Sequence, residues 1–297
     1  MNLDRTDHFV GQTTSPLDAL RSSVNEPRVA IPLVRSALRS RVVGPLMSPW
    51  REGAVAMVHI GRCGSTAVSD MLAQHPMVYW DGETYHRVYR ELRSTGVDVT
   101  ASGFDPAEYI AGRLSRSGRR WFGFDAKFHQ FMQGGSSIEQ YVSDLSHVGV
   151  TKFISLRRRN YLRKVVSSKL GRSRGWYHTR EPPKEDGRKV RIDVASVHVD
   201  TVETSLLEHF QRWELRYESL ERVVPADRLL CLEYEADIES NPLRAYDKIV
   251  KFLELKPWVA QVATHRVNPQ PVADLIVNFE EVRGALAGTT HEWMLAT

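Results

Sequence analysis

Residues Ala54 to Pro76 read AVAMVHIGRCGSTAVSDMLAQHP, and their order of apolar run, glycine-containing loop and amphipathic segment indicates the class of fold. The apolar run that ends at Ile60 predicts a buried strand, and the amphipathic pattern from Ser65 onward predicts a helix. The glycine-containing loop between them directs its backbone amides and the helix N-terminus at one point, which creates a binding site for an anion. The candidate residues of this site are Gly61, Arg62, Cys63, Gly64, Ser65 and Thr66.

The loop differs from the P-loop of nucleoside-triphosphate enzymes. That loop follows the pattern GxxxxGK[ST], whereas Gly64 is followed directly by Ser65 and Thr66, and the cation, Arg62, comes earlier. The order basic residue, any residue, Gly, Ser, Thr resembles the 5′-phosphosulfate loop of the sulfotransferases that use 3′-phosphoadenosine 5′-phosphosulfate (PAPS), in particular the bacterial and carbohydrate-type members. The resemblance implies PAPS as the donor, adenosine 3′,5′-bisphosphate as the product, and no metal ion.

A second segment matches the same family. Residues Thr151 to Leu156 predict another buried strand, which runs into a basic helix. In the family, the 3′-phosphate element is an arginine at a strand end and a serine eight residues later; Arg159 and Ser167 have this spacing, although Tyr161 replaces the usual proline. An arginine can bind a phosphate through two parallel hydrogen bonds, and Ser167 lies close to the same helix face. We therefore expect Arg62 and Arg159 to hold opposite ends of one nucleotide.

A third segment resembles the family more loosely. Leu229 to Glu233 predicts a strand, and the following Tyr-Glu…Asn-Pro…Phe-Leu pattern opens a helix that ends near Leu253. The resemblance implies that Tyr234 lies near the adenine. A half-buried tyrosine at a strand end is the structural alternative.

Composition limits the class of protein. The 297 residues are 42% hydrophobic, which suffices for the core of one large domain. No apolar run is long enough to cross a membrane, and the first residues lack the profile of a signal peptide, so we expect a cytoplasmic protein. The two cysteines, Cys63 and Cys231, form no metal-binding or disulfide spacing.

The net charge of +4 is unevenly distributed. Residues 1–200 carry ten more basic than acidic residues, whereas residues 201–297 carry six more acidic than basic ones. The segment Arg157 to Arg191 alone contains 13 basic and three acidic residues. This charge attracts a polyanionic donor and would also suit an anionic acceptor. Nucleic acid is not expected as a partner, because no helix-turn-helix, RRM or zinc-finger signature accompanies the charge.

Apolar runs that alternate with amphipathic segments predict an α/β fold, with a central parallel β-sheet flanked by helices on both faces. This domain spans residues 51–297 and follows a mostly helical N-terminal extension, residues 1–50. A stretch rich in Arg, Lys and Pro predicts a basic loop over the site at residues 171–193. Strands are expected at Ala54–Ile60, Met77–Trp80, Trp121–Asp125, Thr151–Leu156 and Leu229–Glu233. Helices are expected at Ser65–Gln74, Thr84–Arg93, Pro106–Ser115, Ile138–Ser146, Asn160–Leu170, Val197–Val223, Pro242–Leu253 and Val272–Leu286.

Sulfuryl transfer to a hydroxyl needs a base near the acceptor and a cation near the departing phosphate. Arg62 is the candidate cation, and its role is electrostatic because a guanidinium group keeps its proton. The stretch His75 to His86 resembles the His-Pro…Glu…His segment of glycan sulfotransferases. This resemblance implies that Glu83 is the base, with Asp81 and His86 as alternatives. The alternative for Glu83 is a structural role, in which its negative charge stabilises the start of the next helix.

Four further residues are candidates for contacts with the substrates. Lys127 and His129 follow a predicted strand and would point to the same side if the extended conformation continues. Trp176 and His178 begin the basic loop and could shape an acceptor pocket, although a packed tryptophan is an equal alternative. The acceptor, a hydroxyl of a carbohydrate, a glycolipid or a small metabolite, stays open, and so does the oligomeric state.

Two other functions fit parts of the pattern. A P-loop kinase or other nucleotide-binding protein would use Asp125, at the end of a strand, as a magnesium ligand, but the lysine of its loop is missing. A non-catalytic binder of anionic polymers would use only the basic segment Arg157 to Arg191. Binding of adenosine 3′,5′-bisphosphate without magnesium distinguishes a sulfotransferase from both.

Overall fold

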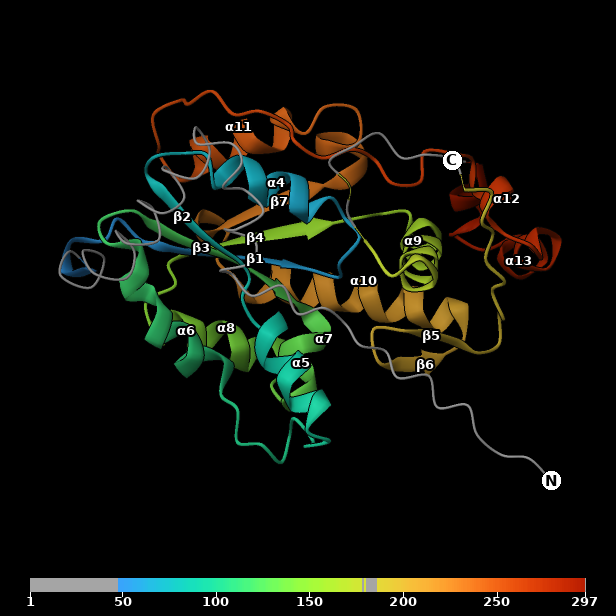
Figure 1. The fold of residues 1–297 in the computed structure, drawn as a ribbon, viewed down its shortest axis with the longest axis horizontal. Coiled ribbons are helices and arrows are strands. Elements are labelled where there is room, and N and C mark those ends of the chain that lie inside the picture. Colours follow the sequence, from blue (N-terminus) through green and yellow to red (C-terminus); the bar gives the residue numbers. More distant parts are fainter. Residues whose placement is uncertain (1–47, 178, 180–185, 297) are drawn as a thin grey trace, which may run out of the picture.

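Five parallel strands form the central sheet of the computed structural model, which describes residues 48–177, 179 and 186–296. The strands are β1 (Ala54–His59), β2 (Val78–Glu83), β3 (Trp121–Lys127), β4 (Lys152–Arg157) and β7 (Leu229–Glu233). Their order across the sheet is β2-β3-β1-β4-β7 (Figure 1). The predicted parallel sheet is therefore confirmed. Residues 1–47, most of the predicted N-terminal extension, lie outside the described residues.

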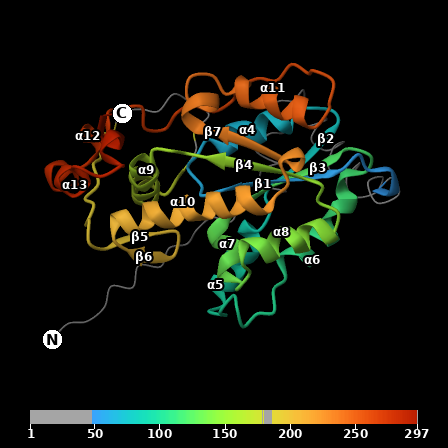
Figure 2. The ribbon, with the colours of Figure 1, turned by 180° about the vertical axis from the view of Figure 1, so that it is seen from behind.

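Helices cover both faces of the sheet, as predicted. Figures 1 and 2 show from opposite sides that α4 (Ser65–Leu72) and α11 (Leu243–Phe252) lie on one face, whereas α8 (Ile138–His147) and α10 (Leu206–Val223) lie on the other. The other α-helices of the described residues are α5 (His86–Ser94), α6 (Pro106–Leu114), α7 (Phe128–Gln133), α9 (Tyr161–Arg174), α12 (Val272–Leu275) and α13 (Phe279–Leu286).

The central strand β1 shows why the sheet is covered twice. Every residue of β1 is buried, and successive side chains of a strand point to opposite faces. Val55 and Met57 belong to the hydrophobic core that includes residues of α4 and α11, whereas Ala56 and Val58 belong to the larger core that includes residues of α8 and α10. A strand that is apolar on both sides needs helices on both sides.

Three local differences from the predicted elements change the surroundings of the site. The predicted helix Val197–Val223 begins as a hairpin, formed by β5 (Val197–Val199) and β6 (Val202–Thr204), because its valines alternate with polar residues and favour strands. The helix α7 starts directly after β3, so the extended pattern assumed for Lys127 and His129 is wrong.

The third difference concerns the predicted helix Val272–Leu286, which is divided into α12 and α13. The side chain of Asn278, just before α13, exchanges two hydrogen bonds with the backbone of Ile192. This pairing holds Asn278 outside helical geometry and connects the C-terminal segment to the end of the basic loop.

The strand ends bring charged residues to one edge of the sheet. His59 at the end of β1 lies beside Lys127 of β3, and Arg157 of β4 lies beside Glu233 of β7. Glu83, the last residue of β2, pairs with Asp125 after a β-bulge. Open α/β sheets bind their ligands outside the carboxyl ends of the strands. The fold therefore collects the candidate residues where a ligand is expected.

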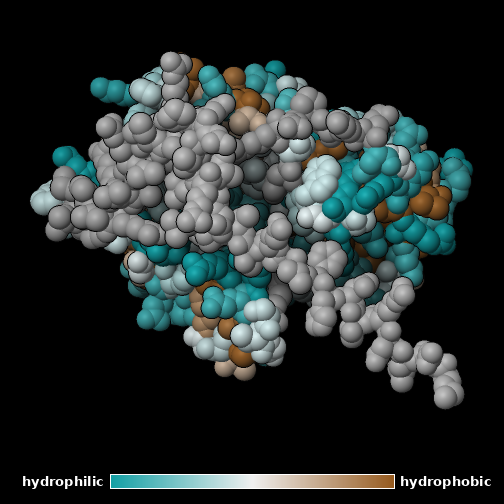
Figure 3. Space-filling model, viewed as in Figure 1, coloured by the Kyte–Doolittle hydropathy of each residue, from teal (hydrophilic) through white to brown (hydrophobic). Residues whose placement is uncertain are grey.

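The surface drawn in Figure 3 is mainly hydrophilic where residues are coloured, with hydrophobic residues in small separate groups. Within the described part of the chain, no helix has the length and apolar character needed to span a membrane.

Candidate active site

A cavity of about 1230 Å³ lies at the carboxyl edge of the sheet. Its walls come from the loop after β1, from α9, from the loop 262–268, from the ends of β2 and β3, and from the β5–β6 hairpin. The predicted loop residues Gly61, Arg62, Gly64, Ser65 and Thr66 all line it. The two segments identified in the sequence, the loop at 61–66 and the helix after β4, therefore face one cavity.

The phosphate loop (residues 61–66) needs glycine at position 64 for two reasons. Gly64 has φ +80°, in the left-handed region that side chains disfavour. A Cβ atom there would lie 2.8 Å from Cγ2 of Ile238 and 3.0 Å from Cδ2 of Tyr234. The carbonyl of Gly64 accepts hydrogen bonds from the amides of Ala67 and Val68, which begins α4. Ser65, Thr66 and Ala67 at the start of this helix line the cavity, and the N-terminus of a helix favours an anion.

Cys63 is the loop residue that does not line the cavity. Its side chain is fully buried and belongs to the core that includes residues of α4 and α11. The thiol lies in an apolar slot beneath the loop, so the predicted contribution of Cys63 to binding rests on its backbone amide. His59 lies next to it, also fully buried, and its Nδ1 accepts a hydrogen bond from the amide of Gly61 over 2.9 Å. His59 supports the loop from below.

Arg62 occupies the centre of the cavity wall. Its φ is +58°, unusual for a residue other than glycine, and its Nε donates a hydrogen bond to Oγ of Ser167 on α9 over 3.0 Å. The ring of Tyr177 lies 5.4 Å from its guanidinium carbon. Burial and the neighbouring cation Arg158 lower the pKa of Arg62. An anion in the cavity would offset both effects.

Arg158 is the main feature that the sequence motif did not predict. It is 7% exposed, it lines the cavity, and its Nη1 donates a hydrogen bond to the carbonyl of Arg62 over 2.8 Å. Its guanidinium carbon lies 4.4 Å from the ring centroid of Tyr234. Its Nε is buried without a hydrogen-bond partner. A buried donor of this kind carries a free-energy cost that a bound anion would remove.

Arg158 belongs to a group of three arginines at the cavity, which we call the cation cluster: Arg158, Arg163 and Arg266. Arg163 is 5% exposed, and its Nη1 donates to the carbonyl of Asn268 over 3.2 Å. Burial, Arg266 and Arg158 lower the pKa of Arg163 to about 10. Arg266 forms an ion pair with Glu239 over 2.8 Å. Three guanidinium groups close enough to affect one another lie at one end of the cavity, and such a group can bind a doubly charged anion.

Arg159, the residue that the motif predicts to bind the 3′-phosphate, does not line the cavity. The Glu235 carboxylate accepts hydrogen bonds from the amides of Arg159 and Asn160, which fixes the backbone at the end of β4. The Arg159 guanidinium is 57% exposed and lies 3.7 Å from Glu233. Its neighbour Arg158 faces the cavity instead, because adjacent residues at a strand end point in opposite directions. Ser167, its predicted partner, does line the cavity.

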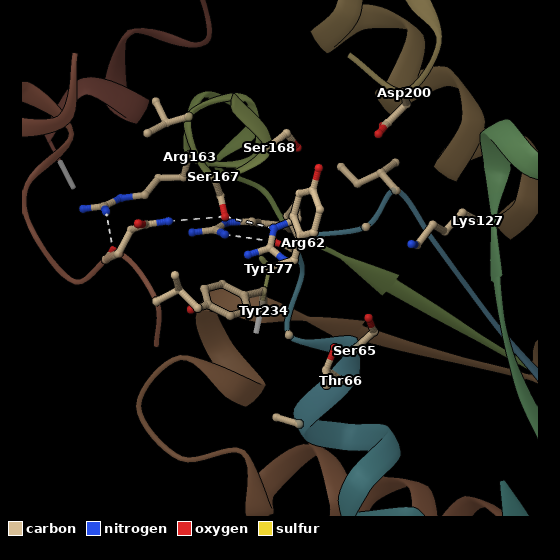
Figure 4. A pocket seen from close by; sticks show the side chains of 18 of the residues that line it. Arg62, Ser65, Thr66, Lys127, Arg163, Ser167, Ser168, Tyr177, Asp200 and Tyr234 are labelled. Carbon is tan, nitrogen blue, oxygen red and sulfur yellow. Dashed lines mark hydrogen bonds between the residues drawn. The ribbon is translucent and has the colours of Figure 1, made fainter. Parts of the chain in front are cut away.

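Tyr234 begins a short π-helix after β7 and is 8% exposed. It lines the cavity with its ring between Gly64 and Arg158. Figure 4 shows Tyr234 and Arg163 on one side of Arg62, whereas Lys127 and Asp200 lie on the other side. We call these two sides the arginine end and the lysine end of the cavity.

Glu83 and Lys127 meet at the lysine end. Their side chains form an ion pair over 2.6 Å, and His86 Nδ1 lies 3.8 Å from the Glu83 carboxylate. Burial raises the pKa of Glu83, but Lys127 outweighs it and holds the pKa below its usual value. Glu83 ends a strand, so it is not the first acidic residue of a helix. Glu83, His86, Lys127 and His129 all line the cavity, the last from α7.

Three predicted site residues remain to be placed: Asp81, Trp176 and His178. Arg113 donates two hydrogen bonds to the Asp81 carboxylate, which is only 4% exposed and does not line the cavity. Asp81 is thus not available as a base. Trp176 is 41% exposed and stacks with Arg174 outside the cavity; the next residue, Tyr177, lines it instead. His178 lies outside the described residues.

Structure comparison finds similar folds. The chain is similar to a sulfotransferase from Alicyclobacillus acidocaldarius, with 14% identity and a TM-score of 0.48 over 82% of this chain and 95% of that one. It is also similar to the sulfotransferase domain of the Synechococcus PCC 7002 olefin synthase, with 18% identity and a TM-score of 0.42 over 82% and 86% of the two chains. No protein-family model matches the sequence, and no curated protein matches it. At these identities the likeness concerns the fold, and the function must be argued from the site.

Proposed function

We propose that this protein is a sulfotransferase that moves the sulfuryl group of PAPS to a hydroxyl group. The observation that carries the proposal is the position of Arg62: it belongs to the phosphate loop, bonds to Ser167 of α9, and lies between two groups of charged residues. A nucleotide with a phosphate at each end would use both the loop and the arginine end. A nucleotide with one phosphate group would leave the cation cluster unused.

The residues present suit PAPS. Ser65, Thr66 and the loop amides would bind the 5′-phosphate, where Gly64 permits close approach of the backbone. The cation cluster and Ser167 would bind the 3′-phosphate, and the buried Nε of Arg158 would gain a partner. Tyr234 would lie beside the adenine, between the two phosphates.

Chemistry would take place at the lysine end. Glu83 would accept the proton of the acceptor hydroxyl as its oxygen bonds to sulfur, and the bond from sulfur to the bridging oxygen of the donor would break. Negative charge then develops on the departing 5′-phosphate, where Arg62 stabilises it. Lys127 holds Glu83 ionised, and His86 is the reserve base next to it. The partner is therefore a hydroxyl-bearing acceptor.

The kinase alternative requires Asp125 as a magnesium ligand, and the position of Asp125 does not suit this role. Asp125 is 3% exposed and does not line the cavity. Its carboxylate accepts hydrogen bonds from Ser69 and Trp80 and faces His59 at 3.4 Å. Through these contacts Asp125, on β3, connects α4 and β2 to β1 beneath the loop. Among the described residues, no group of three or more His, Cys, Asp and Glu side chains is placed to hold a metal ion.

Ion pairs neutralise part of the positive charge that the polymer-binding alternative requires. Arg174 pairs with Asp186, Arg188 with the same carboxylate, and Arg191 with Glu281. Among the described residues of this segment, Arg158, Arg163 and Arg172 direct their charge to the cavity. A long polymer would need such charge on the outside.

Equilibrium binding tests the proposal. We expect adenosine 3′,5′-bisphosphate to bind in the presence of EDTA, measured by calorimetry, and to raise the melting temperature. Adenosine 5′-phosphate, which lacks the 3′-phosphate, should bind at least about 10-fold more weakly, because the cation cluster has nothing to hold. Tighter binding of ATP with magnesium than of the bisphosphate would contradict the proposal.

A further inference from the structure

The β5–β6 hairpin presents its two-residue tip to the cavity. Val199 pairs with Val202, so Asp200 and Thr201 form the turn, and both line the cavity. Their φ values of +53° and +72° are those of a type I′ turn, for which Asn-Gly is the preferred pair. A β-branched threonine in this region is a true outlier. Backbone strain of this kind is concentrated at positions that contact ligands.

A buried lysine holds the tip in place. Lys164 of α9 is 0% exposed, its Nζ bonds to Oδ2 of Asp200, and it lies 4.9 Å from the ring centroid of Trp213. A buried charge is tolerated only when it is paired in this way. The hairpin tip is thereby attached to the helix that carries Arg163 and Ser167.

Asp200 keeps an accessible face toward the acceptor. Its side chain is 22% exposed, and Figure 4 shows it on the same side of Arg62 as Lys127, the partner of Glu83. Burial raises the pKa of Asp200, but Lys164 and, more weakly, His129 and Lys127 hold it below the usual value. Two ionised carboxylates, Glu83 and Asp200, therefore face the lysine end.

We propose that Asp200 is a specificity residue: its carboxylate accepts a hydrogen bond from an acceptor hydroxyl other than the one that is sulfated. This inference rests on the proposed function and restricts the acceptor to compounds with at least two hydroxyl groups, such as sugars and other polyols. An ionised carboxylate only accepts hydrogen bonds, so its complement on the acceptor is a donor group. Phenols and alcohols with a single hydroxyl offer no such group once that hydroxyl is held by Glu83.

The variant Asp200→Asn tests this role with little change of shape, because asparagine also tolerates the left-handed conformation. It leaves Lys164 without its charged partner, so the double variant Lys164→Met/Asp200→Asn, which removes both charges, is measured beside it. The matched control is Glu203→Gln on the same hairpin, because Glu203 is exposed and does not line the cavity. Bisphosphate binding by every variant shows whether the donor site is intact.

The assay measures transfer from [35S]PAPS to a panel of methyl hexopyranosides and their monodeoxy analogues, with cyclohexanol and 4-nitrophenol as single-hydroxyl acceptors. We expect transfer to at least one hexopyranoside and a loss of about 10- to 100-fold in kcat/KM for one monodeoxy analogue, as for a lost charge-assisted hydrogen bond. Asp200→Asn and the double variant should reproduce that loss with the parent sugar, mainly through KM, and cause no further loss with the deoxy analogue. Glu203→Gln should match the wild type.

Three outcomes would overturn the inference while bisphosphate binding stands. The first is that the single-hydroxyl acceptors are sulfated as efficiently as the sugars, or that they are sulfated and the sugars are not. The second is an equal loss for every acceptor in Asp200→Asn. The third is a loss of kcat at saturating sugar, which would make Asp200 a base. Absence of bisphosphate binding by the wild type would overturn the proposed function itself, and the inference with it.

Discussion

Nε of Arg62 donates a hydrogen bond to Oγ of Ser167, 105 residues later in the chain, over 3.0 Å. In the opposite direction, Nη1 of Arg158 donates to the carbonyl of Arg62 over 2.8 Å. These two bonds join the phosphate loop to the strand end and helix that follow β4. The first bond orients the Arg62 guanidinium and the second fixes its backbone before any ligand binds, which would reduce the reorganisation needed during the proposed transfer.

The first prediction concerns this orientation. Arg62→Ala should lower the rate of sulfuryl transfer by about 100- to 1000-fold, as for other lost groups that stabilise developing charge. Arg62→Lys should recover only part of the rate, because an ammonium group lacks the planar fork that holds Ser167. The measurement is the single-turnover rate with [35S]PAPS. The control is Arg87→Ala, an exposed residue that does not line the cavity. Equal rates for Arg62→Ala and the control would exclude the assigned role.

The second prediction uses two adjacent arginines. Arg158→Ala should weaken binding of adenosine 3′,5′-bisphosphate by about 10- to 100-fold, whereas Arg159→Ala should leave it nearly unchanged, because only Arg158 faces the cavity. Calorimetry gives both affinities. Arg163→Ala should behave like Arg158→Ala, without removing the bond to the Arg62 carbonyl. The reverse ranking of Arg158→Ala and Arg159→Ala would mean that the sequence motif, and not this geometry, identifies the phosphate ligand.

The third prediction concerns the base. Glu83→Gln should abolish transfer and leave bisphosphate binding within about twofold, since the amide keeps the shape but accepts no proton. Unchanged transfer would remove Glu83 from this role and leave His86, 3.8 Å away, as the alternative. The control for a general effect of the substitution is Glu91→Gln on α5, an exposed residue that does not line the cavity.

The fourth prediction follows from the Glu83–Lys127 pair. Lys127 holds the pKa of Glu83 below its usual value, so the wild-type base is active above that low pKa and loses activity only as the pH falls through it. In Lys127→Met the pKa of Glu83 should rise, because burial is then opposed only by the smaller effects of His59 and His86. The acidic limb of the pH profile of kcat should therefore move to higher pH. A limb that stays in place would show that another group titrates.

The fifth prediction separates backbone strain from close contact. Gly64→Ala and Gly288→Ala both place a Cβ at positive φ, +80° and +69°, which costs about 1 kcal/mol of folding free energy. Only Gly64 also has neighbours within 3 Å of that Cβ. We expect Gly64→Ala to lower the melting temperature more than Gly288→Ala and to weaken bisphosphate binding at least about 10-fold, since the loop amides must move. Equal effects on binding would contradict the assignment of the loop.

The strands and the phosphate loop could be predicted from the sequence because their signals are local. Apolar runs bounded by glycine and charge gave the five strands within a few residues, and the loop residues except Cys63 line one cavity, as predicted. Helix α7 and the hairpin were missed because segments this short contain too few residues for a clear periodicity; α7 packs on β3 and α8, and β5 packs on α9. Asp200 carried no signal, because an Asp-Thr pair is not a preferred turn.

The parallel sheet, its two helical layers and the glycine-containing loop after β1 follow from the sequence alone, since periodicity and glycine placement act over a few neighbouring residues. Only the tertiary structure shows which of three consecutive arginines lines the cavity, and it brings Arg266 and Asp200 to opposite ends of that cavity. These choices depend on where Glu235 fixes the strand end and where Lys164 holds the hairpin. Such contacts join residues far apart in the chain, so local spacing patterns in the sequence do not predict them.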